Sequence, residues 1–253
     1  SKEKDGQRWY VTGYTAISNY AGSGGGGGYC HSGEVRACTF LANTSRWGGG
    51  VYACAGAVLD SAFSNNAAVD GGGVYLQSGS TSANCRLVGN RASHDGGAVF
   101  GTVLLTDGRR SAAAGCTIIS NYAASGGGGG YCYSGDVRSC TFLANSATFG
   151  GGVFADAGAV FDSAFTNNSA TEGGGIYFLA GSTSVNCRWA GNRASEHGGG
   201  VYALGTFIRD GWFSNNVAMT NGGAVNAQSS SVITNCQLFG NMASNGFGGG
   251  VYC

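Results

Sequence analysis

Residues 165–177, FTNNSATEGGGIY, contain the pattern that decides the fold. An aromatic residue is followed three places later by Asn, and a run of Gly then precedes an aliphatic residue and Tyr. The pattern recurs along the chain, for example as FLANTSRWGGGVY at 40–52 and FSNNAAVDGGGVY at 63–75. Self-similarity at a fixed period predicts an array of stacked structural units.

The marker asparagine of this pattern recurs at intervals of 23–25 residues, apart from one step of 31. Between the markers, apolar residues alternate in short runs and show no helical period, which favours short strands joined by tight turns. A unit of about 24 residues cannot bury its own apolar face, so it must stack on its neighbours. The markers are Asn19, Asn43, Asn66, Asn90, Asn121, Asn145, Asn168, Asn192, Asn216 and Asn241.

A parallel β-helix fits a unit of this length. Three short strands and three corners use about 24 residues, and successive coils lie about 4.8 Å apart. We expect a right-handed winding, following the bias of parallel β crossovers. The sequence therefore predicts one all-β solenoid domain over residues 1–253, with about ten coils and a stacked ladder of marker asparagines.

A longer repeat of about 102 residues is superimposed on the coils. GGGGGYCHSGEVRACTFLAN at 24–43 matches GGGGGYCYSGDVRSCTFLAN at 126–145. We interpret this as a duplicated super-unit of four coils, followed by further coils. The expected bounds are about 5–106 for the first super-unit, 107–208 for the second and 209–253 for the extra coils.

The single long step between markers carries about seven extra residues, Leu104–Arg110. They predict a protruding corner loop. Neither end of the sequence carries a recognisable cap, which leaves two readings open: an excerpt of a longer array, or a subunit that stacks end to end with other copies.

The composition fits a solenoid and argues against other classes. The chain has 50 Gly without a three-residue period, which excludes collagen, and no Pro, as expected of central strands. Thirteen basic and thirteen acidic residues give zero formal net charge, so nothing indicates binding to nucleic acid. No apolar run approaches the ~20 residues of a membrane-spanning helix, and we do not expect a membrane-embedded protein.

The paired signature, aromatic-x-x-Asn followed by Gly-Gly-Ala/Gly-aliphatic-Tyr, resembles the repeats of the chlamydial polymorphic membrane proteins and related bacterial surface proteins. Eight good copies in phase cover nearly the whole chain. The resemblance implies an exported right-handed β-helical passenger, displayed outside the cell or on its surface in a bacterium and used for adhesion.

The residue after each aliphatic position is expected to point outward, because neighbouring side chains in a strand face opposite sides. An outward aromatic stripe would suit lateral packing, a surface glycan or a host receptor. The alternative is that strand curvature half-buries the rings. The tyrosines of this candidate contact stripe are Tyr29, Tyr52, Tyr75, Tyr131, Tyr177, Tyr202 and Tyr252.

Ten cysteines need an account. Cys30 with Cys38, and Cys132 with Cys140, bracket the same Ser-Gly corner in the two super-units. We predict that each pair forms a disulfide, which implies an oxidising compartment. Cys253 follows the Tyr column without a partner and is a candidate for an intersubunit bond. The pairing of the remaining cysteines stays open: Cys54, Cys85, Cys116, Cys187 and Cys236.

Carboxylates and histidines on adjacent coils are the best candidates for catalysis. Parallel β-helices often carry polysaccharide lyases and hydrolases, so this reading follows by analogy of fold. The residues lie in a variable turn, which predicts a solvated charged corner where a raised pKa is hard to maintain. The two sets are Asp70 with His94 and Asp95, and Glu172 with Glu196 and His197.

We accordingly expect no catalytic residue and no cofactor. A zinc site is not expected either, because the three His are far apart in the sequence and no Cys-x-x-Cys occurs. The sequence favours an extracellular or cell-surface structural or adhesive solenoid that assembles end to end into a fibre. The alternative is a polysaccharide lyase or hydrolase on the same fold.

Overall fold

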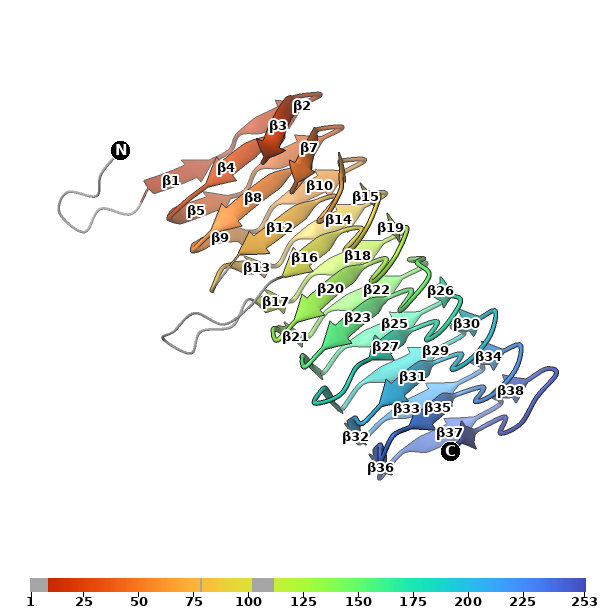
Figure 1. Cartoon of the computed structure of the whole chain (residues 1–253). Helices are drawn as coiled ribbons and strands as arrows, with labels where there is room; N and C mark the ends of the chain where they lie inside the picture. Colours follow the sequence, from red (N-terminus) through yellow and green to blue (C-terminus); the bar gives the residue numbers. More distant parts are fainter. Residues whose placement is uncertain (1–8, 78, 102–111) are drawn as a thin grey trace.

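The structure is a computed structural model that describes residues 9–77, 79–101 and 112–253. These residues form 39 β-strands and no helix, wound into one column of stacked coils (Figure 1). The strands of successive coils pair in parallel, for example Phe63 with Leu87 and Tyr75 with Phe100. The predicted all-β parallel solenoid of about ten coils is therefore confirmed. Its sense of winding stays a prediction.

Each complete coil contributes segments to four strand columns, whereas the sequence predicted three. The first two columns are continuous sheets of ten strands each. The first column contains β1 (Trp9–Thr12), β5 (Gly33–Arg36), β9 (Gly56–Leu59), β13 (Thr81–Ala83), β17 (Ala112–Ala114), β21 (Asp136–Arg138), β24 (Ala159–Phe161), β28 (Thr183–Val185), β32 (Phe207–Arg209) and β36 (Val232–Thr234). The second contains β2 (Thr15–Ile17), β6 (Thr39–Leu41), β10 (Ala62–Ser64), β14 (Arg86–Val88), β18 (Thr117–Ile119), β22 (Thr141–Leu143), β25 (Ala164–Thr166), β29 (Arg188–Ala190), β33 (Trp212–Ser214) and β37 (Gln237–Phe239).

The third column is the one that the sequence missed, because most of its strands are only two residues long and show no alternation. It divides into sheets of five and four strands, which Ser146 joins through isolated bridges to Tyr122 and Ser169. The first of these sheets contains β3 (Tyr20–Gly24), β7 (Thr44–Trp47), β11 (Ala67–Ala68), β15 (Arg91–Ala92) and β19 (Tyr122–Ala123). The second contains β26 (Ser169–Ala170), β30 (Arg193–Ala194), β34 (Val217–Ala218) and β38 (Met242–Ala243).

The fourth column is again a continuous ten-stranded sheet and carries the aliphatic–Tyr pairs. Its inward positions, such as Val74, Ile176 and Val201, are fully buried. Its strands are β4 (Gly28–Cys30), β8 (Val51–Cys54), β12 (Val74–Gln77), β16 (Val99–Gly101), β20 (Gly130–Tyr133), β23 (Val153–Asp156), β27 (Ile176–Phe178), β31 (Val201–Leu204), β35 (Val225–Gln228) and β39 (Val251–Tyr252).

The core runs along the inside of the column, and part of it is a stack of aromatic rings. Phe142, Phe165, Trp189 and Phe213 lie on successive coils with ring centroids 4.3–5.9 Å apart. All four side chains are essentially inaccessible to solvent. Because coils repeat in register, one aromatic position in the sequence pattern becomes a continuous apolar stack.

The glycine run between the third and fourth columns contains positions with two different requirements. Gly150 has a φ of +63°, a left-handed conformation that residues with a side chain rarely adopt. Gly151 has no room for a side chain, since a Cβ there would lie 2.4 Å from the Ser169 carbonyl oxygen and 2.5 Å from that of Gly174. The glycines therefore allow the backbones of adjacent coils to approach closely at this corner.

Candidate functional site

The ten marker asparagines lie above one another at the corner between the second and third columns. At each of the nine steps, the side-chain oxygen of one Asn accepts from both the backbone N–H and the side-chain amide of the preceding marker. The donor–acceptor distances are 2.8–3.0 Å. The ladder stays continuous from Asn90 to Asn121. The loop predicted at Leu104–Arg110, within that step, lies outside the described residues.

Eight aromatic side chains form a second ladder on the outer face of the fourth column, here called the aromatic ladder. Adjacent rings are nearly parallel, with interplanar angles of 2–19° and centroids 4.8–5.3 Å apart. Its members are Tyr29, Tyr52, Tyr75, Phe100, Tyr131, Phe154, Tyr177 and Tyr202. Asn226 occupies the next place and separates Tyr252 from the ladder.

The rings of the aromatic ladder are neither freely exposed nor buried. Tyr29 at one end is 60% exposed, and the rings that follow it are half-buried. Each ring covers the face of its neighbour, so along the ladder it is the ring edges that meet solvent. This arrangement combines the two readings that the sequence left open, since the side chains point outward and yet lose much of their surface to one another.

A surface depression of about 330 Å³ lies beside the aromatic ladder. Phe149, from the neighbouring corner, packs edge-on against Tyr177 at 5.3 Å and an interplanar angle of 65°. Aromatic and polar side chains converge here on one concave surface, as they do in many ligand sites. The lining residues are Asp95, Ser125, Tyr131, Phe149, Phe154, Tyr177 and Leu179.

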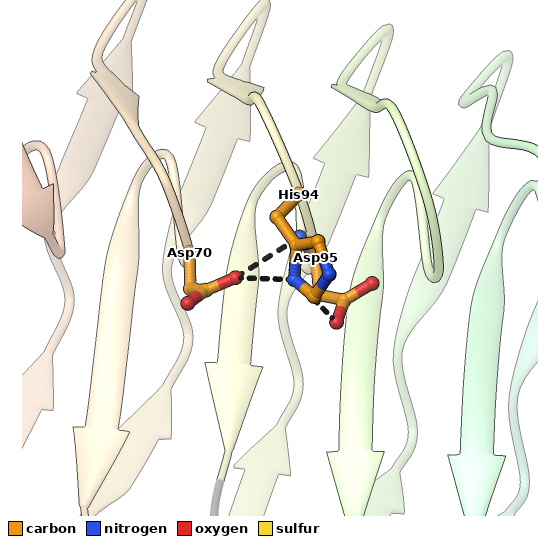
Figure 2. Close-up of side chains that lie close together, drawn as sticks. All are labelled: Asp70, His94 and Asp95. Carbon is orange, nitrogen blue, oxygen red and sulfur yellow. Dashed lines mark hydrogen bonds and ion pairs between the residues drawn. The ribbon is translucent and has the colours of Figure 1, made fainter.

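Asp70, His94 and Asp95 meet on adjacent coils (Figure 2), and Asp95 also lines this depression. The Nδ1 atom of His94 lies 3.1 Å from Oδ1 of Asp70 and 2.9 Å from Oδ2 of Asp95. The Gly126 N–H donates to Oδ1 of Asp95 at 2.7 Å and orients that carboxylate. The short loop between the third and fourth columns thus holds both carboxylates against one imidazole.

Asp95 departs from the solvated corner that the sequence predicted, because this residue is only 8% exposed. Burial raises the pKa of its carboxyl group, while the Gly126 hydrogen bond and His94 partly offset the effect. The sequence predicted an exposed turn because the residues at this place vary between copies of the repeat. The missing information was that the next coil covers the carboxylate.

Glu172, Glu196 and His197 form the equivalent cluster in the second super-unit, with one ligand atom from each within 4.8 Å of the others. The Thr220 hydroxyl donates to the Glu196 carbonyl oxygen at 2.7 Å, and its oxygen lies 2.7 Å from Nδ1 of His197. Burial raises the pKa of the Glu172 carboxyl group. The nearby His197 partly offsets this shift, and the charge of Glu196 adds to it. The sequence predicted that these three residues fall on adjacent coils, and the structure places them close together.

The two expected disulfides are not formed in the structure, in which none of the ten cysteines is bonded to another. The Cys38 thiol donates to the Arg36 carbonyl oxygen at 3.1 Å, and the Cys140 thiol donates to that of Arg138 at 3.2 Å. Cys30 and Cys132 are buried in the fourth column, and Cys253 is exposed. Cys30 and Cys132 therefore lie in the fourth column, whereas Cys38 and Cys140 lie at the corner between the first and second columns.

These features define a β-solenoid repeat protein with an internal asparagine ladder and an external aromatic ladder. Residues 162–179 match the Chlamydia polymorphic membrane protein repeat, which confirms the expected resemblance over the coil that contains β25 and β27. No curated protein matches the chain. The described residues include no helix that is long and apolar enough to cross a membrane.

Proposed function

We propose that the chain is an adhesive rod exported to the surface of a bacterial cell. The observation that carries this proposal is the aromatic ladder, which continues over eight coils on one face and borders a concave depression. The repeat match at residues 162–179 supports a surface location. The rod provides length and rigidity, and the ladder provides the contact surface.

The exposed surface of the ladder explains how contact would occur. Ring edges and tyrosine hydroxyls, rather than ring faces, are available along most of its length, so hydrogen bonding and edge contacts would dominate there. At the depression, Phe149 is turned relative to Tyr177, and Asp95 adds a carboxylate beside it. Such a mixture suits a sugar, which presents both C–H groups and hydroxyls.

Binding of the purified chain to cells and to immobilised glycans tests the adhesive role. Replacing Phe149 by Ala should weaken binding about tenfold or more, the usual effect of removing an aromatic anchor from a contact surface. Tyr122→Ala is the matched control, because Tyr122 is an exposed tyrosine on the third column, away from the ladder. Equal binding by both variants and the unaltered chain would reject the depression beside the aromatic ladder as the contact surface.

Self-association by coil stacking is a second part of the proposal. Coils pair in almost the same register along the described column, so another copy could continue the pairing at a free coil edge. Electron microscopy at increasing protein concentration should show rods joined end to end. Rods of a single length at every concentration would contradict this assembly.

The alternative function, a polysaccharide lyase or hydrolase, has one specific observation in its favour: Asp95 is a buried carboxyl with a raised pKa next to Asp70. One oxygen of each carboxylate lies against the same imidazole nitrogen, so the pair is arranged around His94 rather than around a substrate. Release of reducing or unsaturated sugars from polysaccharides, abolished by Asp95→Asn, would establish the enzyme and displace the adhesive proposal.

A further inference from the structure

The two polar clusters occupy equivalent places in the duplicated sequence. Each residue of the first cluster has a counterpart 102 positions later in the second. Both clusters contain two carboxylates and one imidazole, but the order differs: Asp, His, Asp in the first and Glu, Glu, His in the second. The chemical set is therefore kept, although the residue at each position changes.

The same places in the other coils carry no such groups. The two columns that follow the marker Asn by four and five positions contain Asp, Glu or His only in these two clusters. At the fifth position after the marker Asn, the other eight coils carry mostly Gly, including Gly71, Gly126 and Gly173. A corner selected only for solubility would scatter its charges over many coils, whereas these charges gather twice, with the same composition.

The geometry of the first cluster matches the coordination of an ion. Adjacent ligands of an octahedral ion with bonds of about 2.1 Å lie about 3.0 Å apart. The Nδ1 atom of His94 lies 3.1 and 2.9 Å from its two carboxylate oxygens. An ion that displaces the Nδ1 proton would therefore need little movement of the three ligand atoms.

Hydrogen bonds from outside the clusters orient the ligands, as is typical around protein-bound metals. The Gly126 N–H holds one oxygen of Asp95 and leaves the other facing His94. In the second cluster the Thr220 hydroxyl donates its proton to the Glu196 carbonyl oxygen. The Thr220 oxygen therefore accepts a hydrogen bond from Nδ1–H of His197. That bond leaves Nε2 as the His197 nitrogen that can coordinate an ion.

We propose that each cluster binds one divalent transition-metal ion of the Zn²⁺ or Mn²⁺ class, which links two adjacent coils. One nitrogen and two carboxylate ligands favour these ions over Mg²⁺ and Ca²⁺, which prefer oxygen alone. The remaining coordination positions face solvent beside the exposed His94. This inference does not depend on the adhesive role.

Equilibrium dialysis of the full chain against micromolar ZnCl₂, after stripping with a chelator, tests the proposal. All proteins carry Cys253→Ser, because that exposed thiol would itself take up zinc. We expect two Zn²⁺ per chain in this background, one in His94→Gln, one in His197→Gln and none in the double variant. His31→Gln, which changes the histidine outside both clusters, should retain two.

Two further measurements keep the outcome decisive. Circular dichroism checks that the variants fold, as expected for a substitution at the exposed His94. Replacing Zn²⁺ by Co²⁺ should give weak visible bands from nitrogen and oxygen ligands, without the strong near-ultraviolet bands of thiolate. No zinc uptake in the unaltered clusters, equal uptake by the folded double variant, or thiolate bands would each overturn the proposal.

Discussion

The side-chain amide of Asn145 donates to Oδ1 of Asn168 at 3.0 Å, one coil further along the column. Asn168 in turn donates to Oδ1 of Asn192 at 3.0 Å and to the Phe142 carbonyl oxygen at 3.1 Å. Its oxygen also accepts from the backbone N–H of Asn145 at 2.9 Å. Every polar atom of this fully buried amide is therefore paired, and the coils are connected through side chains as well as through their sheets.

Replacing Asn168 by Ala should remove this connection. Two donors of Asn145 would be left buried without an acceptor, at a cost of about 1–3 kcal/mol each. We expect the free energy of unfolding to fall by about 3–5 kcal/mol, measured by chemical denaturation. Asn65→Gly is the control, because Asn65 is an exposed corner residue with a φ of 54°, and it should change stability by less than about 1 kcal/mol.

Gly151→Ala should disrupt coil stacking, since the new Cβ would meet two carbonyl oxygens at 2.4 and 2.5 Å and neither backbone can move independently. We expect a loss of more than about 3 kcal/mol or failure to fold. Gly130→Ala is the matched control, because the nearest atom to a Cβ there is 3.7 Å away. Similar melting temperatures for the two variants would contradict the close approach of the coils.

Three inner tyrosines of the aromatic ladder should ionise late. Burial raises the pKa of Tyr52, Tyr131 and Tyr177 to about 12 from an ordinary value of 10.0. Between pH 10 and 12 the unfolded chain has released these protons while the folded chain keeps them, so stability should fall as pH rises through this window. Ultraviolet titration of phenolate and denaturation at several pH values measure the two effects.

Tyr177→Phe provides the control for that titration, since it keeps the ring stack and removes one phenol. It should reduce the amplitude of the late step and leave stability at neutral pH within about 1 kcal/mol. A folded chain whose twelve tyrosines all ionise together near pH 10 would contradict the buried ladder.

Thiol titration distinguishes the sequence expectation from the structure. Without disulfides, the denatured chain should react with ten equivalents of a thiol reagent, whereas two disulfides would leave six. In the folded chain only the exposed Cys253 should react quickly, followed by the half-buried Cys54 and Cys236. Burial also raises the pKa of the Cys187 thiol, which slows its reaction further.

Trp189→Phe should be nearly neutral, although the side chain is fully buried. Among the described residues, the Trp189 indole N–H is a buried donor without a partner, which costs about 1–3 kcal/mol. The smaller ring leaves a cavity whose cost is on the order of 1 kcal/mol, and it continues the Phe165–Phe213 stack. We expect a change within about 1 kcal/mol by denaturation, whereas Phe213→Ala should lose about 3–5 kcal/mol.

The sequence by itself determined the length of a coil and which residues of successive coils stack on one another. The period of about 24 residues sets the length of one turn of the column, and in-register stacking converts equal places in the repeat into neighbours in space. For that reason the contacts between Asn145 and Asn168, between Tyr177 and Tyr202, and within the two polar clusters could be anticipated from spacing alone.

Only the tertiary structure decided what surrounds each column. The two-residue strands of the third column, the burial of Asp95 and the hydrogen bond between His197 and Thr220 depend on how the next coil covers a corner. Whether the two cysteines of a predicted disulfide meet likewise depends on the strand or corner that each occupies, not on their separation in sequence. Periodicity fixes which residues meet between coils, because the stacking distance is constant. It does not fix the path of the chain within a coil, and that path sets the burial of each side chain.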